Sequence, residues 1–499
     1  MKLGFLLVWL LLGASLSAKE LTPTERFLRE FHANPAAVMD RLPRKSGVSD
    51  AHLIRSRDPA AQWEERQRFR KMLRANTAGS PMAPRLFSDY LLNDRVEDLV
   101  DNSDTLLRDL NQISKAGLTK ARLQVQPWSG DYWPFYRGVL GARVYDPYFM
   151  SQDQFANAQD YILKNPFLPI FLSGVAEKIN QLSVSEKYDL LMGNQQGGFT
   201  QNQWWEGEQY KDANGHVETW MGICHGWAPA AFMEDRPERS VELLAADGKT
   251  RLQFRPSEIK GLSTHLWANT RFPTRFVGGR CNSKSPQKDE NGRVIEPNCV
   301  DNNPATWHLA VVNQIGVSKR SFIIDATYDY QVWNQPVLSY SYTYFNPQTL
   351  EETPDLNKAT IPIGEYSVDK FKKYRSPKAK KVVGVTMTVS YLLEEMANER
   401  DYDAAEFDAV RTVEYVYDLE LDDRGLPIGG EWYSNAHPDF LWVPEPNATV
   451  IGMDEASLPV WNGDGALPVE WRRLGVYKGN RGALLGRLVE LMIRKAQTP

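Results

Sequence analysis

The chain has 499 residues, of which 42% are hydrophobic and 11% aromatic, with a formal net charge of −5 at pH 7 and a pI near 5.9. This length is too great for one simple core and predicts two or three domains or one elaborated domain. The slightly negative net charge argues against nucleic acid as a partner. Both charge signs are mixed along the chain, so nothing indicates that one strong electrostatic field steers a charged partner to the protein.

The first 18 residues have the pattern of a secretion signal. Lys2 precedes an apolar run over 3–12, and small residues follow as far as Ala18. The apolar run is too short to cross a bilayer, so 1–18 is predicted to be a cleaved signal peptide. We expect the mature chain to be secreted, extracellular or periplasmic, and the sequence after the signal contains no further candidate membrane span.

Residues 19–120 are predicted to be mainly helical. A helix start at 22–25 precedes apolar residues at helical spacing, and the same spacing returns over 91–110. No pattern in this segment indicates chemistry. It is therefore either a packing or chaperoning domain or a removable pro-segment that covers the active site.

Residues 121–375 form the predicted core and 376–499 a β-rich extension. The core begins with an aromatic, turn-rich stretch, passes through a helix opened by the capping-box pair Ser183 and Glu186, and then becomes mainly strand-like. Three segments of the extension are predicted strands: 382–392, 413–421 and 430–443. The chain ends in a basic amphipathic helix over 479–495, which we expect to dock on the protein rather than on a membrane.

The three cysteines are an odd number for a chain with a secretion signal. Thiols tend to pair in an oxidising compartment, and Cys281 and Cys299 lie on either side of a turn-rich stretch. We predict a disulfide between them, worth roughly 3 kcal/mol of loop closure. Cys224 is left over and is the candidate nucleophile.

The residues around Cys224 predict the start of a helix. Trp220 ends a strand-like run, Gly222 permits a tight turn, and 227–233 is mostly good helix material. In the first turn of a helix, unpaired N–H groups and the helix dipole would stabilise a thiolate and could hold an oxyanion. Pro229 leaves the register of this helix open. The structural alternative is a small buried hydrophobic residue.

His308 is the candidate base among the seven histidines. It lies in an apolar run over 307–313, a second apolar run covers 321–327, and a short polar turn separates the two. If both runs are strands of a hairpin, His308 and Asp325 lie opposite each other with their side chains on one face. An aspartate paired to a histidine fixes the imidazole tautomer, so the pattern predicts a Cys224–His308–Asp325 triad. The alternative is a structural histidine within a strand.

The order Cys, His, Asp and the pattern His-x-x-Val-Val before Asp-Ala-Thr resemble the transglutaminase core. Longer stretches resemble one branch of it, the transglutaminase elicitor family, over about 120–450. The matching stretches are 127–134, 222–230, 279–282, 303–308, 325–327 and 332–337. The last of these is similar to the start of the family's elicitor peptide, and the sequence after Val337 departs from that peptide.

The resemblance implies an α+β fold with a papain-like core and an antiparallel sheet. It implies the activity of a protein-glutamine gamma-glutamyltransferase, in which Cys224 attacks a protein glutamine, His308 is the acid and base, and Asp325 orients the imidazole. The partners would be a protein glutamine donor and a lysine or polyamine acceptor. The indoles of Trp204, Trp205 and Trp220 are candidate second donors for an oxyanion.

Two alternative functions remain open from the sequence. The same triad with water as acceptor would make a cysteine protease or a glutamine deamidase, and a core without activity would make a secreted interaction or elicitor protein. The chemistry requires no cofactor. Calcium dependence is implied by the resemblance alone, since the acidic segments at 289–292 and 422–423 read as turns and no loop has EF-hand spacing.

Overall fold

We describe a computed structural model of the chain, which covers residues 20–49, 94–281, 283, 285–296, 299, 302–326 and 331–497. The predicted signal peptide over 1–18 and His52 lie outside the described residues.

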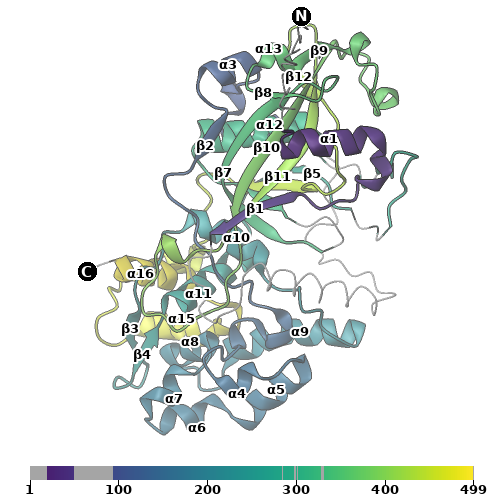
Figure 1. Cartoon of the computed structure of the whole chain (residues 1–499). Coiled ribbons are helices and arrows are strands. Elements are labelled where there is room, and N and C mark those ends of the chain that lie inside the picture. Colours follow the sequence, from purple (N-terminus) through teal and green to yellow (C-terminus); the bar gives the residue numbers. More distant parts are fainter. Residues whose placement is uncertain are drawn as a thin grey trace, which may run out of the picture.

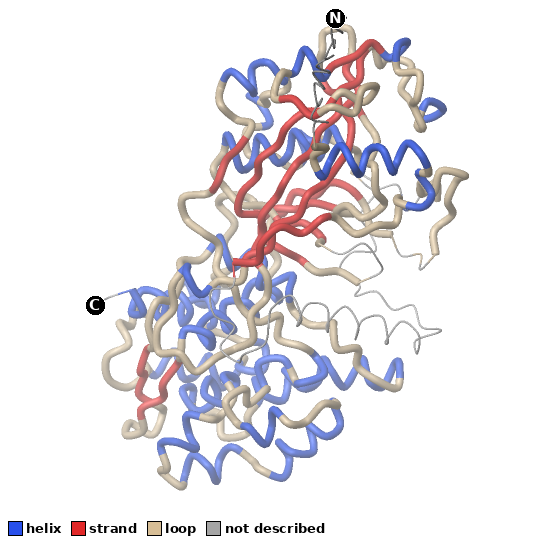
Figure 2. Tube along the Cα trace, viewed as in Figure 1, coloured by secondary structure: helices blue, strands red, loops and turns tan. Residues whose placement is uncertain are grey.

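Helices and strands separate into two halves of the molecule (Figures 1 and 2). The half at the bottom of Figure 1 is mainly helical, and the half at the top contains a large sheet with helices on its surface. Helix α10 (Cys224–Met233) lies between them. Since every strand pairing in the described chain is antiparallel, the predicted α+β class with an antiparallel sheet is confirmed.

The large sheet contains eleven strands of the described chain. They are β1 (Arg44–Ser49), β2 (Lys120–Arg122), β5 (Thr274–Gly278), β6 (Ile323–Asp325), β7 (Asn334–Phe345), β8 (Glu352–Thr353), β9 (Thr360–Pro362), β10 (Lys381–Leu392), β11 (Val410–Leu421), β12 (Pro427–Gly429) and β13 (Phe440–Pro444). The main path runs β1-β11-β10-β7-β6-β13-β5. The central strand β10 is rich in valine and threonine, which suit a pleated sheet.

Helices dominate the other half. They are α4 (Pro147–Met150), α5 (Phe155–Lys164), α6 (Phe167–Leu172), α7 (Ala176–Asn180), α8 (Val184–Met192), α9 (Gly198–Asn214), α11 (Pro256–Asn269), α14 (Met453–Ala456), α15 (Val469–Tyr477) and α16 (Leu485–Gln497), beside a hairpin of β3 (Val241–Leu244) and β4 (Arg251–Phe254). The predicted capping box opens α8: the Ser183 hydroxyl accepts from the Glu186 N–H, and the Glu186 carboxylate accepts from the Ser183 N–H. The terminal helix α16 packs on α11, as expected for a docked helix.

The described part of the N-terminal segment belongs to the sheet half. Helix α1 (Pro23–Ala33) begins at the predicted helix start, where Thr22 and Glu25 form a capping box, and its Leu28 and Phe31 are buried in an aromatic cluster with Phe345, Phe371 and Tyr433. β1 then pairs with β11 as the edge strand of the sheet. This part of the segment therefore completes the sheet.

The predicted helical repeat over 91–110 is largely wrong. Of the described residues there, only two short 3₁₀ turns, Val96–Asp98 and Ser103–Thr105, are helical before α3 (Leu110–Lys115). The side chain of Asn313 accepts a hydrogen bond from the Leu107 N–H and donates one to the Leu107 carbonyl. A tertiary partner thus satisfies backbone groups that a helix would have paired.

The predicted boundary at 375/376 does not separate two structural units. β10 of the predicted extension pairs with β7 of the predicted core, and β13 pairs with β6 and β5. The strands predicted over 382–392 and 413–421 correspond to β10 and β11, whereas only the end of 430–443 is strand. Pairings between residues far apart in sequence leave little signal in the local pattern.

The predicted strand over 307–313 is wrong, because it is helix. Asn303 caps α12 (Pro304–Val311) by accepting from the Ala305 and Thr306 N–H groups, and Pro304 occupies its first position. A π-helical turn over Val312–Val317 follows. The apolar run is buried on every side, so it lacks the periodicity that would separate a helix from a strand. No hairpin joins His308 to Asp325.

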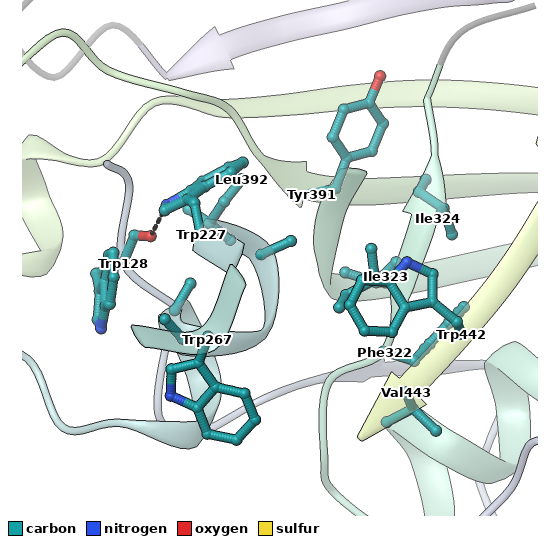
Figure 3. Close-up of a cluster of buried hydrophobic side chains, with 14 of the residues drawn as sticks. Trp128, Trp227, Trp267, Phe322, Ile323, Ile324, Tyr391, Leu392, Trp442 and Val443 are labelled. Atoms are coloured by element: carbon teal, nitrogen blue, oxygen red, sulfur yellow. Dashed lines mark hydrogen bonds between the residues drawn. The ribbon is translucent and has the colours of Figure 1, made fainter. Parts of the chain in front are cut away.

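A cluster of large apolar side chains lies where α10 meets the sheet (Figure 3). Trp227 of α10 donates its indole N–H to the Trp128 carbonyl, and both indoles are almost fully buried. Phe322 and Trp442 approach from the sheet side. This packing fixes the position of α10, and with it Cys224, against the strands.

Candidate active site

Cys224 is the first residue of α10 and so lies in the first turn of a helix, as the sequence predicted. The preceding loop is held by a hydrogen bond from the Ile223 N–H to the Tyr132 carbonyl, 2.7 Å long. Gly222 lies so close to Tyr132 that a Cβ would sit 2.5 Å from the Tyr132 carbonyl oxygen. Glycine is therefore required for the loop to approach this backbone and start the helix.

The Cys224 sulfur contacts two groups from the segment that leads into β7. The amide Nδ2 of Asn334 donates to Sγ at 3.4 Å, and Sγ lies 3.8 Å from the Val332 carbonyl oxygen. The Asn334 Oδ1 accepts from the indole Nε1 of Trp442, on β13, at 2.8 Å. The thiol is 6% exposed and Asn334 only 1%, so these contacts are shielded from water.

Asp325 lies beside this cluster, at the end of β6. It is the cross-strand partner of Asn334, and its Oδ1 accepts from the Trp333 N–H at 3.0 Å. The sequence predicted Asp325 on a strand opposite His308; it lies on a strand, but its cross-strand partner is Asn334. A second carboxylate, that of Glu394, accepts from Gln335 at 2.6 Å.

Burial raises the pKa of the Cys224 thiol to about 11. The Asn334 hydrogen bonds lower this pKa, whereas the nearby carboxylates of Glu394 and Asp325 raise it further. At neutral pH the sulfur is therefore a protonated thiol in this structure. The start of a helix is not sufficient to produce a thiolate here.

His308 does not join the site, and the predicted triad is not assembled. Its Nδ1 lies 2.9 Å from the Tyr417 hydroxyl, and its ring meets the Tyr342 ring edge-on at 4.7 Å. Tyr342 is eight residues beyond Asn334 on β7, roughly 26 Å along the strand. Burial lowers the pKa of His308 to about 3, so the imidazole is a neutral core residue.

No other histidine in the described chain forms a hydrogen bond with Cys224. His225 follows Cys224 directly, and adjacent residues do not face each other on a helix. The remaining ones are His32 among aromatic rings, exposed His216, His265 bonded to Gln203, and His437 stacked on Trp432. Among the described residues, an amide hydrogen-bonds the thiol and two carboxylates are near enough to shift its pKa, whereas no imidazole forms a hydrogen bond with it.

The sequence did not identify Asn334 and Trp442 as site residues. Among the predicted indole donors, Trp205 is exposed, Trp204 packs against Phe155, and Trp220 donates to Glu218. Asn334 does fall within the matching stretch 332–337, which was the available signal. The sequence carried no signal for Trp442, because only the pairing of β13 with β6 brings it beside Asn334.

The predicted disulfide between Cys281 and Cys299 is confirmed, with their Cα atoms 4.4 Å apart. Cys224 is the remaining free thiol. The protein therefore contains one free thiol and one disulfide.

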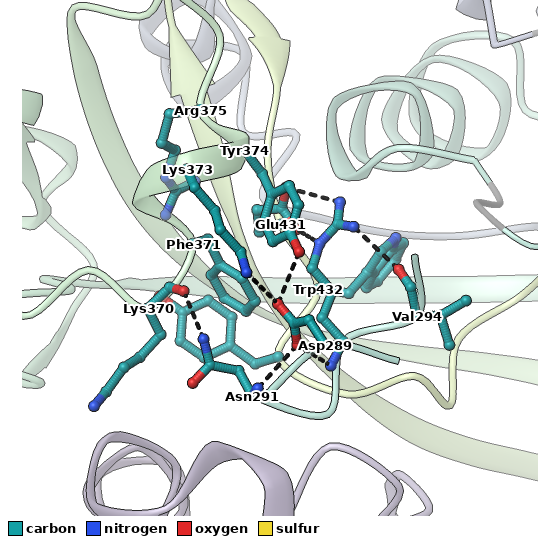
Figure 4. A network of polar contacts seen from close by, with 12 residues as sticks. Asp289, Asn291, Val294, Lys370, Phe371, Lys373, Tyr374, Arg375, Glu431 and Trp432 are labelled. Carbon is teal, nitrogen blue, oxygen red and sulfur yellow. Dashed lines mark hydrogen bonds and ion pairs between the residues drawn. The ribbon is translucent and has the colours of Figure 1, made fainter. Parts of the chain in front are cut away.

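The acidic segments considered for calcium are turns with other hydrogen-bond partners. Asp289 accepts from the Asn291 and Arg293 N–H groups and from the Tyr374 hydroxyl, and Lys373 pairs with it (Figure 4). Asp422 accepts from backbone N–H groups of its own turn. Within the described residues, no three histidine, cysteine or acidic side chains converge as metal ligands.

Each helix in the described part of the chain is too short or too polar to cross a membrane.

Residues 100–457 match the family described as "Transglutaminase elicitor". The chain belongs to this family. Its fold is similar to the crystal structure of the GP42 transglutaminase from Phytophthora sojae, with 21% sequence identity, a TM-score of 0.45, and coverage of 76% of this chain and 95% of that one. No curated protein matches the chain.

Proposed function

We propose that this member of the transglutaminase elicitor family is an acyltransferase that uses the Cys224 thiol. The substrates would be a protein glutamine as acyl donor and a lysine or polyamine as acceptor. Family membership supports this proposal, and so does the position of the chain's one free thiol at the start of α10.

The reaction has two balanced steps. Cys224 sulfur bonds to the glutamine carboxamide carbon, the C–N bond breaks, and ammonia leaves with the thiol proton. The amine then attacks the thioester carbon, its nitrogen forms the new amide, and the sulfur leaves and recovers a proton. The N–H groups at the start of α10 would hold the oxyanion in both steps.

We assign the proton transfer to Asp325 rather than to His308. Asp325 is the cross-strand partner of the residue that contacts the sulfur, whereas His308 lies in the core. Because the raised pKa disfavours a free thiolate, the proton would leave in concert with attack on the carboxamide.

The observation that carries the proposal is a single buried free thiol that accepts a hydrogen bond from the Asn334 amide and has the Asp325 carboxylate near enough to shift its pKa. The test is incubation with a glutamine-containing protein and a fluorescent primary amine, using the full chain and its Cys224→Ala variant. Label incorporation by the parent alone supports transfer. Peptide cleavage without label identifies a protease, and ammonia release without label identifies a deamidase.

A second function is favoured by the displaced histidine and the raised thiol pKa, namely a secreted interaction or elicitor protein without catalysis. Absence of label, cleavage and ammonia from a folded parent protein would support it. For either function we propose an extracellular or periplasmic location, with which the disulfide agrees.

A further inference from the structure

The Asn334 amide is held in one orientation beside the proposed nucleophile. Its oxygen receives the Trp442 indole N–H, and its nitrogen contacts the Cys224 sulfur. An indole nitrogen can only donate a hydrogen bond, so the amide oxygen must face Trp442 and the NH₂ group must face the sulfur. Partners on β13 and α10 thus fix opposite ends of one side chain.

The thiol proton has a separate acceptor, the Val332 carbonyl at 3.8 Å from Sγ. The neutral sulfur therefore donates to Val332 and accepts from Asn334. When the proton leaves, the Val332 hydrogen bond is lost, whereas the Asn334 hydrogen bond becomes charge-assisted and stronger. Asn334 consequently favours the negatively charged form of the sulfur.

Burial makes the orientation of this amide decisive. Asn334 is 1% exposed and Trp442 is 6% exposed, so water cannot easily replace either hydrogen bond. Without the indole N–H, the amide could rotate and direct its oxygen toward the sulfur. That orientation would repel negative charge instead of stabilising it.

We propose that Asn334 stabilises negative charge on the Cys224 sulfur, and that Trp442 is a positioning residue that keeps the Asn334 NH₂ group directed at it. This inference rests on the proposed function of Cys224 and assigns that site two further residues.

The test is the pH dependence of Cys224 alkylation by iodoacetamide in the full chain. The thiol proton passes to buffer, an S–C bond forms and iodide leaves, while the disulfide protects the other two cysteines. Asn334→Ala should move the midpoint of the pH profile upward and slow alkylation at pH 8 by about tenfold or more. Asn334→Asp should move it further, and Trp442→Phe less far in the same direction.

Trp471→Phe is the matched control. Trp471 is a buried indole in the helical half that donates to the Pro459 carbonyl at 2.9 Å, so this variant loses a similar hydrogen bond and should keep the parent midpoint. If folded Asn334→Ala is alkylated with the same pH midpoint as the parent, the inference is overturned. If Asn334→Ala does not fold, an unchanged midpoint in Trp442→Phe would overturn it.

The amine-incorporation assay tests the underlying function separately. Shifted midpoints together with a parent that transfers no amine would remove the transferase proposal and leave the assignment of Asn334 intact. Unchanged midpoints together with a parent that incorporates amine would remove the assignment of Asn334 and leave the transferase proposal intact.

Discussion

Cys224 and His308 lie in two buried regions that differ in their surroundings. Cys224 meets an amide and a backbone carbonyl, with carboxylates near enough to change its pKa. His308 meets the tyrosine rings of β7 and β11 and hydrogen-bonds one hydroxyl. Burial disfavours the charged form of both groups. A buried polar side chain is therefore a candidate for chemistry only where other polar groups converge on it.

The largest effect expected is that of Cys224→Ala on amine incorporation. Removing the nucleophile should lower kcat/KM by at least about 10³-fold, because no other free thiol can form the thioester. Thermal unfolding should change little, since the side chain is small. Retention of parent activity in this variant would exclude Cys224 as the nucleophile and remove the contrast between the two regions.

His308→Ala should affect stability rather than catalysis. Loss of a fully buried ring and its Tyr417 hydrogen bond should lower the free energy of unfolding by about 3 kcal/mol, as measured by urea denaturation. Activity of the folded fraction should equal that of the parent. Tyr417→Phe, which removes only the hydroxyl, should cost about 1 kcal/mol. A large loss of kcat in folded His308→Ala would restore this histidine to the mechanism.

Asp325→Asn separates the proposed proton transfer from a merely structural role. We expect a loss of about 10²-fold in kcat, because an amide cannot accept the thiol proton. The same change removes a negative charge that raises the pKa of Cys224, so the alkylation midpoint should move to lower pH. Unchanged kcat with a lowered midpoint would leave Asp325 as an electrostatic neighbour only.

The remaining effect, spread over several pH units, concerns the pH dependence of stability. His308 takes up a proton near pH 6.5 in the unfolded chain but only near pH 3 in the folded protein. The contribution of neutral His308 to the free energy of unfolding is fully present above pH 6.5. As the pH falls toward 3, only the unfolded chain gains the proton, so this contribution is lost by up to about 1.4 kcal/mol per pH unit. His308→Gln should flatten the curve of unfolding free energy against pH over this interval. Parallel curves for parent and variant would show that His308 titrates normally when folded.

Local patterns predicted the elements with strong short-range signals. The capping pairs at Thr22 and Ser183, the long alternating strands β10 and β11, and the helix start at Cys224 all depend on neighbouring residues. The strand predicted around His308 was wrong, because a helix buried on all sides has the same apolar composition as a buried strand. The hairpin pairing of His308 with Asp325 then failed with it.

The sequence by itself determined that one thiol would remain free, that Cys281 and Cys299 would be joined, and that Cys224 would begin a helix. Cysteine number and local backbone preferences suffice for those conclusions. Tertiary structure alone decided which groups reach the sulfur. β7 brings Asn334 to the sulfur and β13 brings Trp442 to Asn334, while α12 carries His308 into the core. Contacts between strands distant in the chain depend on the pairing of the whole sheet, and no local pattern records that pairing.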